Sequence, residues 1–222
     1  MGGFELVFEV VLRYLPNYLR GLWVSVELTV FSILLGSVLG LIAAMAKLSK
    51  RRVLRLVATI YVEVVRGIPA LVLLLWLYYG LAIVTGVAIP SFLAGIFGLS
   101  IYIGAYLAET FRAGVLSVPR GQRESALSVG MSEGQAFLHI VLPQAVRTII
   151  PPYGNSLVGL LKDTSLVSVI AISELLREAQ YVATATYRTF ESYTLAAVIY
   201  LIVTTGLSYG LKAVERRMSI GQ

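Results

Sequence analysis

The sequence contains three long stretches without a charged residue, and these constrain the fold more than any other feature. They are Leu28–Ala46 with 19 residues, Gly67–Ala108, and Ser192–Leu211 with 20 residues. A helix that crosses a bilayer needs about 20 predominantly apolar residues. The chain is 58% hydrophobic and only 14% charged, whereas soluble domains carry about 25% charged residues. We therefore predict an all-α integral membrane protein.

The charge pattern divides the chain into five predicted transmembrane helices within a single domain, residues 1–222. The spans are expected at about residues 22–46, 56–84, 88–112, 152–173 and 192–211. Pro69 should break the second span, and the adjacent Lys162 and Asp163 imply either a helix break or a polar pathway in the fourth. Basic clusters follow the first and fifth spans. Because such clusters mark cytoplasmic loops, the N-terminus is expected outside and the C-terminus in the cytoplasm.

The first 20 residues do not have the pattern of a removable signal peptide. Glu5 and Glu9 stand where a basic segment would precede the apolar part. Apolar residues from Phe4 to Leu15 recur at helical spacing, with charged residues on the other side. This pattern predicts an amphipathic helix on the membrane surface, or simply the start of the first span.

Residues 121–142 form a polar interval between the apolar segments, and they predict two short helices hinged at Gly130. The first helix should end at this glycine, because glycine best tolerates the left-handed conformation at a helix end. The second should begin at Ser132, since Ser132 and Gln135 have the spacing of a capping box. We expect it to end at Leu142, before Pro143. A helical pair this polar, inside a membrane protein, needs a partner in water.

The sequence lacks the residues of several kinds of catalytic and metal site. It has no cysteine and a single histidine, His139, which excludes disulfides, thiolate catalysis and His-cluster metal sites. No HExxH or Walker A motif occurs, so we expect no enzymatic activity and no cofactor on this chain. The net charge of +6 comes from short basic loops that orient the protein in the membrane. Nucleic acid is therefore not an expected partner.

Two other classes of membrane protein remain as alternatives. An ion-coupled carrier for a small polar solute would use membrane carboxylates, and the candidates are Glu63, Glu109 and Asp163. Each of them has a basic residue within three positions, so structural ion pairs are the simpler interpretation. The chain also lacks the inverted repeat on which secondary carriers are built. The second alternative is a non-transporting assembly protein, which would not need charged residues within a span.

Several motifs resemble those of one transporter family. The stretch Glu124-Ser-Ala, then Gly130, then Ile140-x-Leu142-Pro143 resembles the EAA signature of ABC importer permeases, with Ser125 replacing an alanine. Further phrases resemble the polar amino acid branch, whose members import histidine, glutamine or arginine. They are Glu63-Val-Val-Arg-Gly-Ile-Pro-Ala-Leu71, Ala105-Tyr-Leu-Ala-Glu-Thr-Phe-Arg-Ala-Gly114, Gly121-Gln-x-Glu124, Leu161-Lys-Asp-Thr-Ser-Leu166 and Glu215-Arg-Arg. The likeness covers about residues 20 to 217.

This resemblance implies a permease subunit of an ATP-driven amino acid importer, with the MetI-like fold of type I importers. It implies a prokaryotic cytoplasmic (inner) membrane location and a dimer with a second copy or a paralogue. It also implies an extracytoplasmic amino-acid-binding protein and a cytoplasmic ABC ATPase dimer on separate chains, where ATP and Mg would bind. The residues implied to couple to the ATPase are Gly121, Gln122, Glu124, Ala126, Gly130, Ser132, Glu133, Gln135, Ile140, Leu142 and Pro143.

The substrate site has only candidate residues at this point. A zwitterionic amino acid inside the membrane needs polar partners, because unpaired charges there are costly. The polar groups available in the predicted interior are Glu109, Asn155, Ser156, Lys162, Asp163, Thr164 and Ser165. The alternative for the residues around Lys162 is a structural helix break or interhelix pairing.

Overall fold

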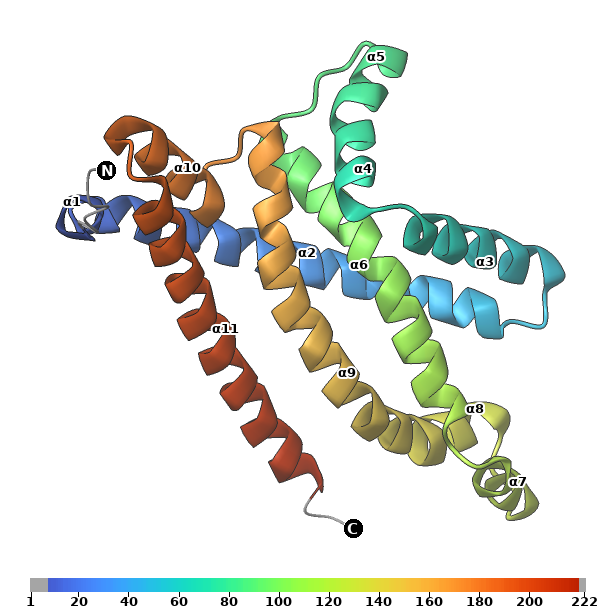
Figure 1. The fold of residues 1–222 in the computed structure, drawn as a ribbon. Helices are drawn as coiled ribbons and strands as arrows, with labels where there is room; N and C mark the ends of the chain where they lie inside the picture. Colours follow the sequence, from blue (N-terminus) through green and yellow to red (C-terminus); the bar gives the residue numbers. More distant parts are fainter. Residues whose placement is uncertain (1–7, 220–222) are drawn as a thin grey trace. The chain divides into compact units, whose positions relative to one another are not determined.

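The computed structural model describes residues 8–219, and the regular structure in this part of the chain is entirely helical (Figure 1). The α-helices are α1 (Phe8–Leu12), α2 (Leu15–Leu48), α3 (Arg52–Gly67), α4 (Ala70–Leu75), α5 (Leu81–Thr85), α6 (Ser91–Leu116), α7 (Arg120–Ser128), α8 (Glu133–Ala136), α9 (Leu142–Asp163), α10 (Leu175–Thr186) and α11 (Thr189–Ser219). Two π-helical segments, Trp76–Gly80 and Phe137–Val141, and a 3₁₀ segment, Thr164–Ile170, lie between them. The predicted amphipathic helix falls partly on Phe4 and Glu5, which are outside the described residues.

Three of the described helices, α2, α6 and α11, are each long and apolar enough to cross a membrane. The number rises to as many as five if each of two bent helix pairs forms one span. The first of these pairs joins α3 to α4 and α5, and the second joins Glu133–Ile170 to α10. The predicted count of five agrees with this upper number. Helices α2 and α11 extend beyond the predicted first and fifth spans at both ends. Helix α6 instead begins at Ser91, after the predicted start of the third span at residue 88, and the helical part of the fourth span ends at Ile170.

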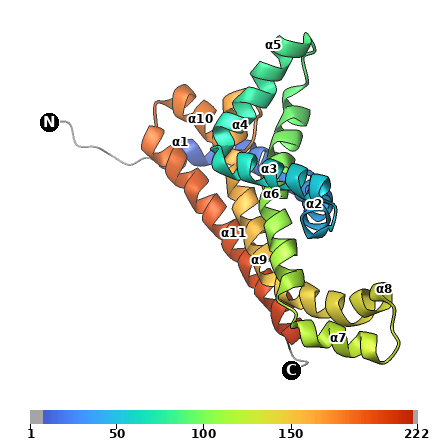
Figure 2. The ribbon, with the colours of Figure 1, turned by 90° about the vertical axis from the view of Figure 1, so that its right-hand side faces the viewer.

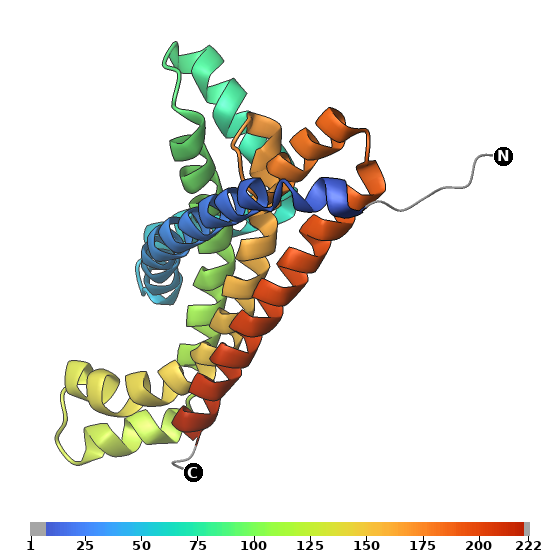
Figure 3. The ribbon, with the colours of Figure 1, turned by 90° about the vertical axis from the view of Figure 1, so that its left-hand side faces the viewer.

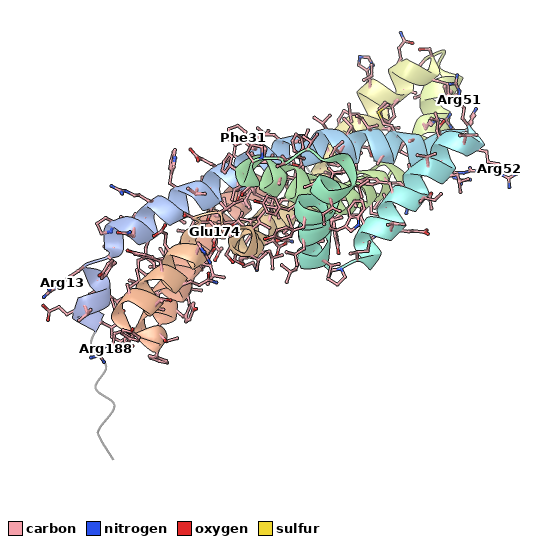
Figure 4. The ribbon with its side chains drawn as sticks, turned by 90° about the horizontal axis from the view of Figure 1, so that it is seen from above. Arg13, Phe31, Arg51, Arg52, Glu174 and Arg188 are labelled. Atoms are coloured by element: carbon pink, nitrogen blue, oxygen red, sulfur yellow. The ribbon has the colours of Figure 1, made fainter. Side chains whose placement is uncertain are left out.

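The predicted break at Pro69 is confirmed. Helix α3 ends at Gly67, and Pro69 takes the N-cap position of α4 with an extended backbone, φ −57° and ψ 135°. Proline lacks an amide hydrogen and biases the residue before it away from helix, so the chain restarts a helix rather than continuing one. Arg51 and Arg52 of the basic cluster lie at the turn between α2 and α3 (Figure 4).

The chain divides into two compact units. The first comprises residues up to 32, 69–99 and 158–207, and the second comprises 33–68, 100–157 and residues from 208 onward. Four of the five boundaries fall inside long helices, so α2, α6, α9 and α11 each contribute to both units, and the fifth falls between α3 and α4.

The first unit is built around a buried carboxylate, Glu174, which caps α10. Its side chain accepts hydrogen bonds from the backbone amides of Leu176 at 2.9 Å and Arg177 at 2.7 Å. The hydroxyl of Tyr200 donates to the same carboxylate at 2.9 Å. Glu174 is fully buried (Figure 4). A buried carboxylate is tolerated here because three donors satisfy it. The sequence analysis did not identify this role of Glu174.

The second unit depends on close helix packing at small residues. A Cβ atom at Gly40 of α2 would lie 2.9 Å from the carbonyl oxygen of Gly104 on α6. Gly36 also packs against α6, at Ile103 and Ser100. Ser100, Gly104 and Ala108, small residues spaced four apart on α6, therefore form a packing face for α2. Glycine at these positions lets two helix backbones approach closely.

Many large apolar side chains of α2 are exposed in this single chain. Trp23 is 64% exposed, Leu34 60%, Ile42 61% and Met45 64%. Phe31 points away from the ribbon in Figure 4. Side chains of this kind are stable when lipid or a partner subunit covers them, as expected for a membrane helix.

Candidate functional site

The α7–α8 hairpin, residues 120–141, is the candidate site with the most regular construction. Helices α7 and α8 lie side by side in two perpendicular views (Figures 1 and 2), and Figure 3 shows the same pairing from the other side. The turn between them closes at Gly130, which has a positive φ of 90°. The amide of Gly130 donates to the carbonyl of Leu127 at 3.0 Å, and that of Met131 donates to Ala126 at 3.2 Å. This is the Schellman helix ending, and it confirms the predicted turn.

The second helix starts as the sequence predicts. The Ser132 hydroxyl accepts a hydrogen bond from the Gln135 amide at 3.3 Å, and the Gln135 side-chain oxygen accepts one from the Ser132 amide at 2.8 Å. Both halves of the capping box are therefore present. Because each cap satisfies an amide that would otherwise lack a partner, the turn from Gly130 to Ser132 has one preferred geometry.

The predicted end of this helix at Leu142 is wrong. The chain passes from α8 through the π-helical segment Phe137–Val141 directly into α9, and Pro143 is the second residue of α9. The Leu142 amide donates to the carbonyl of Phe137, five residues earlier. This wider turn starts a new α-helical register, and Pro143 falls in its first turn, where no amide hydrogen is needed. The hairpin is thus continuous with α9.

Burial within the hairpin is confined to small or medium side chains. Ala126 is 6% exposed, Ala136 is fully buried and Val141 is 5% exposed, while every other residue from 120 to 141 is exposed or partly exposed. Helix α7 contacts both α8 and the π-helical segment. Alanine at positions 126 and 136 suits two helices that pack this closely, because a longer side chain would separate them. The alanine of the EAA-like motif therefore has a packing role.

An ion pair joins the two arms of the hairpin. The Arg123 guanidinium donates from Nε to Glu133 Oε2 at 3.0 Å, and its terminal nitrogen donates to both oxygens of the carboxylate. Such bidentate pairs fix geometry as well as adding energy. Glu133 was among the predicted coupling residues, but Arg123 was not. Sequence reasoning missed Arg123 because the pair joins residues ten positions apart, a distance that only the closed hairpin brings within reach.

The outer surface of the hairpin carries an acidic group and several apolar side chains. Glu124 is exposed, and its side-chain carboxylate makes no hydrogen bond or ion pair with the residues that the structure describes. Val129 is 76% exposed, Leu138 57% and Phe137 38%. An apolar surface around an unpaired charge is typical of a docking site for another protein. Of the other predicted residues, Gly121, Gln122 and Pro143 are exposed and Ile140 and Leu142 are partly buried.

The predicted substrate residues fall into the two units, which are described separately. In the second unit, Glu109 is enclosed by basic groups. Arg112 donates to Glu109 Oε2 from Nε at 3.0 Å and from a terminal nitrogen at 2.8 Å, and the Lys47 ammonium donates to Oε1. The expected Glu109–Arg112 pair is confirmed. Lys47 also pairs with Glu109, and the sequence could not predict this pair because Lys47 lies on another helix, α2.

The other expected ion pair, between Glu63 and Arg66, is not found among the described residues. The Arg66 guanidinium instead lies over the ring of Tyr106, 5.2 Å from its centroid. A cation over an aromatic face is stabilised by the ring quadrupole. The three-residue spacing of Glu63 and Arg66 on one helix therefore did not predict the partner of Arg66.

Asn155 and Ser156 lie on α9 in the second unit. Asn155 is exposed, and the Ser156 hydroxyl donates to the Pro152 carbonyl at 2.9 Å. Beside them, the Tyr153 hydroxyl is 3.0 Å from the Ser37 hydroxyl, and its ring stacks on Phe111 with centroids 6.3 Å apart. This aromatic pair links α6 to α9, and sequence reasoning did not identify it.

In the first unit, the α-helix ends at Asp163, and the 3₁₀ segment begins at Thr164. The helix thus changes from α to 3₁₀ after Asp163 and continues to Ile170, so the chain is not interrupted at Lys162 and Asp163. The buried Thr164 hydroxyl donates to the Leu161 carbonyl at 2.7 Å, and Ser165 is partly buried. Lys162 is exposed and Asp163 is partly buried. Neither side chain forms an ion pair or hydrogen bond with another described residue.

Comparison with known proteins identifies the family. The family model described as the binding-protein-dependent transport system inner membrane component matches residues 36–220. The chain belongs to this family. A probable glutamine ABC transporter permease protein of Bacillus subtilis is 37% identical over 201 residues, which cover 90% of this chain and 93% of the relative.

Solved structures of ABC transporters have the same fold. A chain from a crystal structure of an amino acid ABC transporter with histidines matches with a TM-score of 0.92 and 39% identity, covering 96% of this chain and 100% of its own. A chain of the MetNI methionine ABC transporter in an inward-facing conformation matches with a TM-score of 0.80 at 19% identity, covering 93% and 98%. The predicted MetI-like, type I importer permease fold is confirmed by these matches.

Proposed function

We propose that this chain is the permease subunit of an ATP-driven amino acid importer of the prokaryotic inner membrane. Its similarity to a glutamine permease and to an amino acid transporter supports the substrate class. In this proposal two permease chains, either two copies or a copy and a paralogue, form the pathway. An extracytoplasmic binding protein delivers the amino acid, and a separate ATPase dimer binds ATP and Mg. The N-terminus lies outside and the C-terminus in the cytoplasm.

The observation that carries the proposal is the exposed α7–α8 hairpin. Its Glu124 carboxylate has no partner among the described residues, while the neighbouring charges of Arg123 and Glu133 neutralise one another. Glu124 is therefore the acidic group that remains for a basic residue of the ATPase. The exposed Val129 and Leu138 supply apolar area around it. A central contact surrounded by apolar area is the usual anatomy of a protein interface.

The hairpin is also suited to transmit movement. Its turn is fixed by the Schellman ending and the capping box, and its arms are joined by the Arg123–Glu133 pair. The helix continues without a break from α8 into α9. Movement of the ATPase would therefore act on α9 as on a lever, and α9 carries Asn155 and Ser156. ATP-driven closure of the ATPase would switch the pathway between outward and inward access in this way.

For the substrate, we favour Asp163 over Glu109 as a direct contact. The Glu109 carboxylate is already occupied by Lys47 and Arg112, so a substrate ammonium would have to displace them. Asp163 is only partly buried, and its side-chain carboxylate makes no hydrogen bond with another described residue. Substrate affinity of the detergent-purified complex is the test. The affinity should fall in Asp163→Asn and should be retained in Glu109→Gln, and the reverse order would exclude this assignment.

Docking of the hairpin is tested by co-purification of this chain with its partner ATPase. Glu124→Arg should lower the ATPase recovered per permease by about tenfold, because a like charge then faces the basic partner. Ser125→Arg is the matched control, since it adds the same side chain at the neighbouring exposed position. Equal recovery in wild type and Glu124→Arg would contradict a docking role for Glu124.

A further inference from the structure

A second polar site lies beside the root of the α7–α8 hairpin, within the second unit. It is a half-open pocket of about 560 Å³. Three segments of the chain line it: residues 117–119 between α6 and α7, residues 144–151 in the first three turns of α9, and residues 215–216 near the end of α11. Its polar lining residues are Ser117, Gln144, Arg147, Thr148, Glu215 and Arg216.

The charges in this pocket favour a singly charged anion. Arg147 and Arg216 provide two guanidinium groups, and Glu215 provides one carboxylate. Pro119, the N-cap of α7, also lines the pocket and supplies no side-chain cap, so the positive end of that helix borders the same space. Arg147 is exposed and makes no ion pair with another residue of the described chain. The surplus is one positive charge.

The neutral polar groups of the pocket are already used within the protein. The Ser117 hydroxyl donates to the Gly114 carbonyl at 2.8 Å, and the Gln144 side-chain amide donates to the Ile140 carbonyl at 2.9 Å. The strongest hydrogen-bond donors in the pocket lining are the side chains of Arg147 and Arg216. Guanidinium groups bind phosphate oxygens in a two-pronged geometry, which makes phosphate the best match among anions.

The position of the pocket at the ends of two candidate membrane spans indicates that it lies at the membrane surface. It begins one residue after α6 ends at Leu116, and it includes Arg216, where the candidate span of α11 ends. Exposed apolar side chains stand directly beside the lining residues on three of the elements. Leu116 is 57% exposed, Val146 37% and Val214 50%. A soluble phosphate would leave these side chains uncovered, whereas the acyl chains of a lipid would cover them.

We propose that this pocket binds the phosphodiester headgroup of an anionic phospholipid. The two arginines hold the phosphate, and Glu215 accepts a hydrogen bond from a headgroup hydroxyl, as in a glycerol headgroup. Basic pockets between helices at the cytoplasmic surface bind lipid headgroups in this manner. A zwitterionic headgroup would leave the surplus charge of the pocket unmatched. The site is independent of transport and of ATPase docking, so its test does not depend on the proposed function.

The test is native mass spectrometry of the purified, delipidated complex with added phosphatidylglycerol. Wild type should retain one tightly bound lipid per permease chain. Arg147→Gln with Arg216→Gln should weaken binding about 30-fold, on the basis of the usual contribution of an arginine near an anionic headgroup. The Lys double variant at the same positions should keep most of the binding. Arg177→Gln, an exposed arginine of the other unit, is the matched control and should bind as wild type.

Two further measurements distinguish a lipid phosphate from a soluble phosphate, and both use the wild-type protein. Phosphatidylethanolamine and millimolar inorganic phosphate should not displace the bound phosphatidylglycerol. Displacement by phosphate would assign a soluble ligand, and equal binding of the zwitterionic lipid would contradict the charge argument. With wild type, a photoactivatable phosphatidylglycerol should label peptides that contain residues 116–119 and 144–151. Labelling elsewhere only, or equal retention by the double Gln variant, would overturn the proposal.

Discussion

Arg123 and Glu133 form a bidentate ion pair across the α7–α8 hairpin, from the middle of α7 to the first residue of α8. Both side chains are about half exposed, at 49% and 63%. Exposed ion pairs contribute little to global stability, typically below about 1 kcal/mol. The pair therefore matters chiefly for the angle between the two arms of the hairpin, which we propose as the ATPase docking site.

This relationship predicts a charge-reversal rescue. Arg123→Glu and Glu133→Arg should each lower transport-coupled ATP hydrolysis about three- to fivefold, because like charges then repel across the turn. The double reversal should restore most of the activity, since it rebuilds the pair. The measurement is substrate-stimulated ATPase activity of the reconstituted complex. Failure of the double variant to exceed either single variant would show that the charges act separately on the ATPase.

A second prediction concerns Gly130. Its positive φ of 90° is strained for any residue with a Cβ atom, and no neighbouring atom lies near the position of that Cβ. Gly130→Ala should therefore destabilise the turn by about 1 kcal/mol through backbone strain alone. ATPase co-purification should fall while the melting temperature of the permease changes little.

Gly134 provides the control for this prediction. It also has open space around it, but it lies in α8 without a positive φ. Gly134→Ala should therefore be neutral or slightly stabilising, because alanine favours helix. Equal effects at positions 130 and 134 would mean that the hairpin surface tolerates no added methyl group, and that strain is not the cause.

A third prediction separates packing from function at Gly40. A valine there would bring side-chain atoms onto the backbone of α6, where even a Cβ is 2.9 Å from the Gly104 carbonyl oxygen. Gly40→Val should lower the free energy of unfolding by about 1–3 kcal/mol, seen as a lower melting temperature in detergent. Gly210→Val on α11, with no atom within 4 Å of its Cβ position, should leave the melting temperature of the monomeric chain nearly unchanged. A similar loss at both positions would contradict specific α2–α6 packing.

A fourth prediction concerns the Lys47–Glu109–Arg112 cluster. Glu109→Gln should lower the melting temperature, because Lys47 and Arg112 then lose the charge that holds them in a partly buried site. The expected cost is about 1–3 kcal/mol. Lys47→Met should cost less, since Arg112 still satisfies one carboxylate oxygen. An unchanged melting temperature in Glu109→Gln, together with lost substrate binding, would reassign Glu109 to the substrate site.

Features specified within a few residues could be predicted from the sequence. The turn at Gly130, the capping box of Ser132 and Gln135, and the break at Pro69 each depend on neighbours in the chain, and all three are present. The apolar stretches likewise predicted the membrane helices. Local chemistry determines these features, because backbone strain, capping and desolvation act over one or two turns.

Features that depend on the folded arrangement could not be predicted. The pairing of Arg123 with Glu133 and of Lys47 with Glu109 joins separate helices, and the contact of Arg66 with Tyr106 replaced an expected neighbour on the same helix. The helix continues past Pro143 because a π-helical turn precedes it, and no residue pattern predicts this small change of helical register. The substrate residues remain candidates because polar type alone does not say which of them face a shared cavity.

The most direct test of the central claim is amino acid uptake into proteoliposomes that contain this permease. The account predicts that uptake requires ATP, the ATPase chain and the binding protein together, and that Glu124→Arg abolishes it while Ser125→Arg does not. It also predicts that a proton or sodium gradient without ATP drives no uptake. Uptake driven by an ion gradient in the absence of the ATPase would contradict the account and identify the chain as a carrier.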